Sequence, residues 1–151
     1  MLDDLDRRLL RRLQTNPAMP VAELCDAVGS TAAVTSRRLA RLRADRIILG
    51  KEAIIDWSKL GYNVEVSLRV GLDKTQSRAF DDFIAAAREG PEVIEIQTFL
   101  GRVDVRLSVI AKDMTQYQQI YRARILTLPH IADIEALMQV ARIKSDEVLP
   151  V

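Results

Sequence analysis

A cluster of arginines is the first feature of this sequence that could carry chemistry. The four side chains fall within seven consecutive positions, at Arg37, Arg38, Arg41 and Arg43. A guanidinium can donate two parallel hydrogen bonds to guanine or to a phosphate, so such a cluster can bind a polyanion. Arginines on an exposed helix can equally be surrounded by water alone. The rest of the sequence decides between these two interpretations.

Positive charge is concentrated in the first third of the chain. The net charge of all 151 residues is only +1. Residues 1–50 hold nine basic and six acidic residues, a balance of +3, whereas residues 51–151 hold 13 basic and 15 acidic residues, a balance of −2. A local excess of this kind is typical of a binding surface.

Three helices are predicted before residue 46. Apolar spacing and capping residues place them over residues 2–13, over residues 21–28, and from a cap at Ser30 or Thr31 to about residues 43–45. Gly29 ends the second helix, because glycine adopts a left-handed backbone without strain. Two helices joined by about three residues indicate a helix-turn-helix.

The third helix has two different faces on a wheel of about 100° per residue. Its inward sector holds Ala32, Thr35, Leu39, Leu42 and, at its end, Arg46. Ala33 and Ala40 keep the outward face slim, and a slim face with arginines fits the major groove of DNA. We predict contacts with double-stranded DNA from Thr31, Ala33, Val34, Ser36, Arg37, Arg38 and Arg41.

These side chains differ in what they can contact. Arg37 and Arg41 can bond guanine bidentately, and Val34 can touch a thymine methyl group. The backbone amides at the start of the helix, with Thr31 or Ser36, can hold a phosphate. The alternative is that the helix-turn-helix contacts another protein.

The pattern changes at residue 62. Strands are predicted over residues 62–72, 93–100, 104–111 and 131–140, and helices over residues 80–87 and 117–128. The order β-α-β-β-α-β is that of a ferredoxin-like sandwich, so the fold class is α+β. No third helix remains to cover the second face of the sheet, and we expect a second copy of the chain to cover it. Residues 47–55 are predicted to be extended, and residues 56–61 to form a linker.

Composition restricts the other classes of function. Apolar residues make up 48% and charged residues 28% of the chain, which is typical of a globular domain. No apolar run approaches the roughly 20 residues that cross a bilayer, so we expect a cytoplasmic protein with no membrane partner. Cys25 is the single cysteine and cannot form an intrachain disulfide. The sequence shows no Ser/His/Asp set, metal-ligand spacing or phosphate loop. We therefore expect no enzymatic activity, cofactor or metal, and we place His130 in a turn.

Four segments together resemble the Lrp/AsnC family of bacterial and archaeal transcription regulators. They are LDDLDRRLLRRLQTNPAMPVAELCDAVG, RRLARLRADRII, ILGKEAIIDWSKLGY and LGRVDVRLSVIAKDMTQYQQIYRARILTLPHIADIEALM. In this family the corresponding segments supply the helix-turn-helix, the end of the recognition helix, a hinge strand and the sensing domain. The ordered set covers nearly the whole chain.

The resemblance implies a division of labour along the chain. Residues 1–46 would form a winged-type helix-turn-helix domain, residues 47–61 a hinge strand and linker, and residues 62–151 a ligand-sensing and dimerisation domain. Homodimers would assemble into an octamer or another ring of dimers, and the protein would be nucleoid-associated. A small amino-acid effector would bind at a hairpin lined by Thr98, Leu100, Gly101, Arg102 and Asp104.

The chain departs from the family pattern at several positions. Ser30 and Thr35 stand where the family is apolar, Thr31-Ala32 replaces Ser-Pro, and Arg46 replaces a glycine. Each buried polar group costs about 1 kcal/mol if it lacks a hydrogen-bond partner. A threonine-rich start of the last strand is replaced by Ile134-Glu135-Ala136.

Three alternatives remain open at this point. Residues Gly101 to Asp104 can form an ordinary turn, with a positive φ at Gly101 and backbone amides capped by Asp104. The protein can be an architectural DNA-binding protein without an effector. It can also be a siroheme-decarboxylase-like enzyme of the same architecture.

Overall fold

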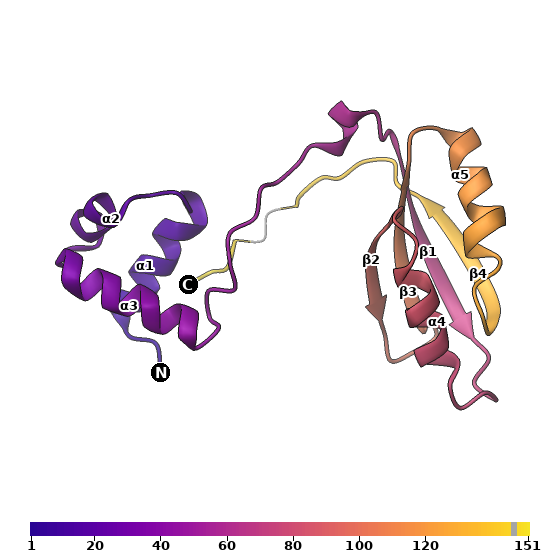
Figure 1. The fold of residues 1–151 in the computed structure, drawn as a ribbon, viewed down its shortest axis with the longest axis horizontal. Helices are drawn as coiled ribbons and strands as arrows, with labels where there is room; N and C mark the ends of the chain where they lie inside the picture. Colours follow the sequence, from indigo (N-terminus) through magenta and orange to yellow (C-terminus); the bar gives the residue numbers. More distant parts are fainter. Residues whose placement is uncertain (146–147) are drawn as a thin grey trace. The chain divides into compact units, whose positions relative to one another are not determined.

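The computed structural model describes residues 1–145 and 148–151, and the chain divides into two compact units (Figure 1). The helix unit comprises residues 1–54 together with the tail, residues 144–151. The sheet unit comprises residues 55–143. The predicted domain of residues 62–151 included this tail, whereas in the structure the tail groups with the helices. It contacts the first helix instead, where the side chain of Gln14 donates to the Leu149 carbonyl at 3.2 Å and accepts from the Leu149 N–H.

Three helices form the helix unit, within two residues of their predicted bounds. They are α1 (Asp4–Thr15), α2 (Val21–Val28) and α3 (Ala32–Ala44). A reciprocal capping box between Asp3 and Asp6 starts α1. Gly29 ends α2 with φ +65°, and Thr31 caps α3 by accepting from the Val34 N–H at 3.3 Å. Leu9, Leu24, Val28 and Leu39 form the buried core.

The inward sector of α3 is only partly as predicted. Thr35, Leu39 and Leu42 are buried, whereas Ala32 and Arg46 are exposed. Arg46 leaves the predicted sector because α3 ends at Ala44 and the backbone at Arg46 is left-handed, with φ +56°. The Thr35 hydroxyl oxygen is buried and has no hydrogen-bond partner in the part of the chain that the structure describes.

The sheet unit has the predicted β-α-β-β-α-β order. Its elements are β1 (Val64–Leu72), α4 (Ala79–Arg88), β2 (Val93–Thr98), β3 (Val105–Ala111), α5 (Met114–Ile120) and β4 (Ile131–Met138). The strands pair antiparallel in the order β2-β3-β1-β4. The helix α5 continues into a π-helical turn, Tyr121–Ile125, which the sequence pattern had not distinguished from an α-helix.

The two faces of this sheet differ in polarity. Val66, Leu68 and Val70 of β1 point to one face and pack with residues of α4 and α5, including Phe83 and Ile120. Strand side chains alternate between the faces, so the opposite face receives the intervening residues. We call it the open face; its central residues are Glu65, Ser67, Arg69, Arg106 and Ser108. A second copy packed there would meet polar side chains rather than an apolar surface.

Residues 47–56 form no strand, although the sequence predicts an extended hinge strand here. An extended segment becomes a strand only when another strand pairs with its backbone, and none of the described residues does so. Apolar side chains of this connector are left in solvent: Leu49 is 82% exposed and Ile54 is 98% exposed. A short 3₁₀ helix, Trp57–Leu60, follows and leads into β1.

The linker is attached to the sheet by a cation–π contact. The Arg142 guanidinium lies 5.8 Å from the centre of the Trp57 ring and donates to the Glu65 carboxylate at 3.0 Å. These contacts hold the start and the end of the sheet unit together.

Candidate nucleic-acid interface and effector site

The outward surface of α3 contains the predicted DNA-contacting residues. This surface combines two arginines with small side chains. Its exposed residues are Thr31, Ala33, Ser36, Arg37, Ala40 and Arg41. Val34 and Arg38 are half-buried. The Thr31 hydroxyl caps the helix by accepting from the Val34 N–H. One of the backbone amides at the start of α3 therefore already has a hydrogen-bond partner.

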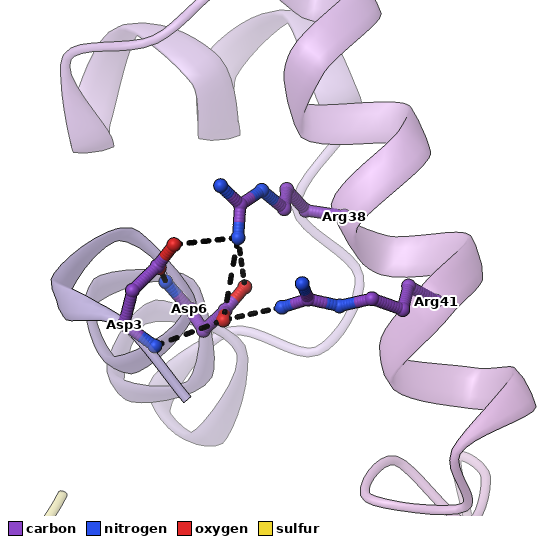
Figure 2. Close-up of polar contacts among 4 residues, drawn as sticks. All are labelled: Asp3, Asp6, Arg38 and Arg41. Carbon is purple, nitrogen blue, oxygen red and sulfur yellow. Dashed lines mark hydrogen bonds and ion pairs between the residues drawn. The ribbon is translucent and has the colours of Figure 1, made fainter. Parts of the chain in front are cut away.

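Two of the predicted arginines are held by carboxylates of α1 (Figure 2). The Asp6 side chain is completely buried and forms an ion pair with Arg41. Arg38 contacts Asp6 at 3.4 Å and Asp3 at 2.6 Å. The Asp6 carboxylate also accepts from the Asp3 N–H at 3.1 Å. The four residues therefore join the start of α1 to the middle of α3.

Arg37 has different surroundings. Its side chain is exposed, and it has no ion pair or side-chain hydrogen bond with any described residue. Of the two arginines that the sequence assigned to guanine, only Arg37 thus has a guanidinium that no carboxylate among residues 1–145 and 148–151 holds. Arg41 would have to exchange Asp6 for a base or a phosphate.

A second basic surface lies on α1, and the sequence analysis missed it. Arg8, Arg11, Arg12 and Thr15 of α1 line a hollow of about 410 Å³ together with Ala27 of α2. Arg11 also donates to the backbone carbonyl of Val151 in the tail. The four arginines at positions 7, 8, 11 and 12 could have indicated this surface in the sequence. They were instead explained by their favourable interaction with the negative end of the helix dipole.

The predicted effector hairpin joins β2 to β3. Thr98, Leu100, Gly101 and Arg102 are exposed, and Gly101 has the expected positive φ, +150°. Backbone pairing closes the hairpin through the Phe99 N–H, which donates to the Asp104 carbonyl at 2.9 Å. The tip thus presents its backbone and the side chain of Leu100 to solvent.

Asp104 is the one buried residue among the predicted effector residues. Its carboxylate accepts from the Leu72 N–H at 2.9 Å and contacts the Lys74 ammonium at 3.1 Å. The Leu72 amide, and then the Lys74 charge, hold the pKa of the Asp104 carboxyl below its usual value of 3.8. Both carboxylate oxygens are therefore used within the chain, and the residue caps the end of β1 as the turn interpretation predicts.

Comparison with known proteins decides the family. The profile of the AsnC-type helix-turn-helix domain matches residues 2–43, and that of the Lrp/AsnC ligand binding domain matches residues 65–149. The chain belongs to the Lrp/AsnC family. It is a DNA-binding transcriptional regulator of this family with a C-terminal ligand-binding domain.

Individual relatives cover almost the whole chain. The DNA-binding transcriptional activator DecR of Escherichia coli (strain K12) is 29% identical over 151 residues, which are 100% of this chain and 99% of that protein. The HTH-type transcriptional regulator Zrp of Zymomonas mobilis is 31% identical and covers 99% of this chain and 97% of its own. A transcriptional regulator of Neisseria meningitidis, solved as a complex with L-Met, superposes with a TM-score of 0.91 at 25% identity, covering 99% and 97% of the two chains.

Several remaining features of this Lrp/AsnC protein bear on the other function classes. Among the described residues, no group of three His, Cys, Asp or Glu side chains is placed to hold a metal ion. No described helix combines the length and the apolar character needed to cross a bilayer. His130 lies in a turn with φ +64°, as predicted, and its Nε2 lies 3.0 Å from the Asp82 carboxylate.

Proposed function

We propose that this protein binds a palindromic operator as a dimer and that a small amino acid modulates its assembly or its affinity for DNA. The observation that carries the DNA-reading part is the outward surface of α3, where the exposed Arg37, accompanied by Ala33 and Ala40, has no carboxylate partner among the described residues. Dimer symmetry would present two such helices to two half-sites.

The three arginines of α3 take different roles in this proposal. Arg37 reads a guanine edge, because its guanidinium is exposed, pairs with no described carboxylate and can make a bidentate contact. Arg38 and Arg41 hold α3 in place through Asp3 and Asp6, and they add positive charge beside the phosphates. Thr31, Ser36 and the first amides of α3 contact the phosphate backbone, and Val34 contacts a thymine methyl group.

Dimerisation is proposed to use the open face of the sheet and the exposed apolar connectors. On the open face, the Arg106 Nε atom is buried without a hydrogen-bond partner, so a partner subunit can supply one. Leu49 and Ile54 of the connector and Val140 and Ile143 after β4 are also largely exposed. A second copy would remove this apolar surface from water.

The effector is proposed to bind at the exposed hairpin, between dimers that assemble into a ring or octamer. The L-Met complex of the Neisseria meningitidis relative supports an amino acid as the ligand class. Gly101 allows close approach of a ligand, Thr98, Leu100 and Arg102 surround it, and Asp104 fixes the end of the hairpin through Leu72.

Duplex DNA selected in vitro from a random pool by the wild-type protein tests the DNA-reading part. We expect Arg37→Ala to weaken binding about tenfold and to relax the preference for one base pair, without changing the salt dependence. Arg88→Ala is the matched control, because Arg88 is an exposed arginine of α4. Fluorescence anisotropy that finds both variants equal to the wild type would refute the role of Arg37.

A thermal-shift screen of the twenty amino acids tests the effector part. A ligand at a hundredfold excess over its dissociation constant should stabilise the protein by about 2.7 kcal/mol. If none of them changes the melting temperature or the oligomeric state, the protein acts as an architectural DNA-binding protein instead. A visible absorption spectrum after addition of a tetrapyrrole tests the enzyme alternative in the same preparation.

A further inference from the structure

A small cavity opens in the helix layer of the sheet unit. It lies between α4, the start of β2 and the π-helical turn after α5, and its volume is about 240 Å³. Val93, Ile120, Ile125 and Leu128 supply apolar walls. None of the residues of the hairpin Thr98 to Asp104 contributes to it.

Three charged residues line this cavity, Glu89, Glu92 and Arg124, and the last two lie close together. The Glu92 Oε2 atom is buried and accepts no hydrogen bond from any described residue. The Arg124 Nε atom lies 3.7 Å from it, which is too long for a hydrogen bond. Buried carboxylate oxygens are nearly always hydrogen-bonded in folded proteins, so Glu92 has an unused capacity to accept one.

The backbone fixes the position of Glu92. The Ile110 N–H of β3 donates to the Glu92 carbonyl at 3.0 Å, and β2 begins with the next residue. The backbone bond places Glu92 at the edge of the sheet, where its side chain is only 20% exposed.

The opposite wall contains an uncommon backbone feature. The π-helical turn spans Tyr121–Ile125, and the Leu126 N–H donates to the Tyr121 carbonyl at 2.9 Å. Such turns insert one residue into an α-helix and occur frequently at functional sites. Here the turn points Ile125 into the core, while Arg124 stays at the mouth of the cavity with half of its side chain exposed.

We propose that this cavity binds a free α-amino acid with an aliphatic side chain. The ammonium group donates to Glu92 Oε2, the carboxylate accepts from the Arg124 guanidinium, and the side chain packs on Val93, Ile120 and Leu128. A zwitterion satisfies both charges at once, whereas an amine or a carboxylate alone satisfies one of them. The volume suits a ligand smaller than the drug-sized molecules that fill pockets of about 300–1,000 Å³. This site is additional to the hairpin and depends on neither DNA binding nor the proposed effector site.

Calorimetric titration of the full chain with L-leucine tests the chemistry of the ligand. Two analogues serve as comparisons: 3-methylbutylamine lacks the carboxylate, and 4-methylpentanoate lacks the ammonium group. Because each loses charge-assisted hydrogen bonds, we expect both to bind at least about tenfold more weakly than L-leucine. Equal binding of L-leucine and either analogue, or no binding of L-leucine, overturns the proposal.

Three variants test the location. We expect Glu92→Gln and Arg124→Met each to weaken L-leucine binding about tenfold or more. Arg122→Met, which changes an exposed neighbour of Arg124, should bind as the wild type does. Binding that survives Glu92→Gln and Arg124→Met but is lost in Arg102→Ala would place the ligand at the hairpin alone. That result would refute the cavity site and leave the proposed function intact.

A direct readout keeps the proposal testable if a variant folds poorly. In methyl spectra of wild-type protein labelled at isoleucine, L-leucine should shift the signals of Ile120 and Ile125. Ile94, an exposed residue of β2 outside the cavity, should not move. Shifts confined to other isoleucines would overturn the proposal.

Discussion

Two regions of the molecule place a buried carboxylate oxygen beside arginine: the contact between α1 and α3, and the cavity beside Glu92. The two carboxylates differ in their partners. Asp6 contacts two arginines and a backbone amide, whereas the Oε2 atom of Glu92 accepts no hydrogen bond and its arginine is 3.7 Å away. A carboxylate with all its partners in the chain stabilises the fold. One that lacks them retains the capacity to bind something else.

Each unit also contains the opposite case: a carboxylate with partners in the sheet unit, and a buried polar group without one in the helix unit. In the sheet unit, Asp104 is satisfied by the Leu72 amide and by Lys74. In the helix unit, the Thr35 hydroxyl is buried without a partner. Substitutions at these four positions should therefore have effects that follow hydrogen bonding rather than burial alone.

Asp6→Ala should have the largest effect. Among the described residues it removes the one carboxylate that contacts both Arg38 and Arg41, and it also removes half of the capping box of α1. We expect the free energy of unfolding to fall by about 2 kcal/mol, since hydrogen bonds to charged groups contribute roughly 1.5–3 kcal/mol. Urea denaturation measures the loss. Asp4→Ala, at an exposed position of the same helical turn, should cost less than about 1 kcal/mol. Equal losses in both variants would mean that the buried network contributes nothing of its own.

Asp104→Asn should have a smaller effect that depends on pH. The pKa of the carboxyl is lower in the folded protein than its usual value of 3.8, so the charged form stabilises the fold at neutral pH. This contribution is lost as the pH falls below 3.8 and through the lowered value. We expect the variant to lose about 1 kcal/mol at pH 7 and to have a flatter decline in melting temperature toward pH 2.5. Asp81→Asn, at an exposed site, should leave the curve unchanged; parallel curves for wild type and Asp104→Asn would contradict the assignment.

Thr35→Val should stabilise the protein. The substitution keeps the shape of the side chain and removes a buried hydroxyl that has no partner, so a gain of about 1 kcal/mol is expected. Chemical denaturation of the full chain would detect it. Thr15, whose hydroxyl donates to the Arg12 carbonyl at 2.9 Å, provides the control, because Thr15→Val should give no gain. A loss of stability in Thr35→Val would show that the hydroxyl does have a partner in solution.

Glu92→Gln should change stability least. The variant keeps the volume of the side chain and loses only a long contact with a half-exposed arginine, so the change should stay within about 0.5 kcal/mol. The same denaturation experiment measures it in the absence of any amino acid. A loss as large as that of Asp6→Ala would make the Glu92–Arg124 pair structural and remove the contrast between the two regions.

Local patterns were enough to predict the elements of the fold. The 3.6-residue spacing of leucines, Gly29 after α2 and the strict alternation from residue 64 to residue 72 each act within one element, and the structure confirms them. The polarity of the open face was equally readable, because Glu65, Ser67 and Arg69 alternate with the buried residues of β1.

The features that sequence analysis missed depend on residues far apart in the chain. The ion pair of Arg41 joins it to a residue 35 positions away, so no helical wheel of α3 could reveal that the guanidinium is held. The prediction of a hinge strand over residues 47–55 was wrong for a related reason. Its residue pattern suits a strand, but a strand also needs a second segment to pair with its backbone. The cavity beside Glu92 arises from three separate elements, and the π-helical turn that shapes it has no distinct periodicity.

The hydrogen bonds between Gln14 and Leu149 make the helix unit discontinuous along the chain. In topological terms, the sheet unit is inserted between the two segments of the helix unit, residues 1–54 and residues 144–151. A fragment cut after α3 would therefore lack a segment of its own fold and leave Gln14 and Arg11 without the backbone groups they bond. Joining the tail to residue 54 through a short flexible linker would instead retain every part of the unit in one continuous chain.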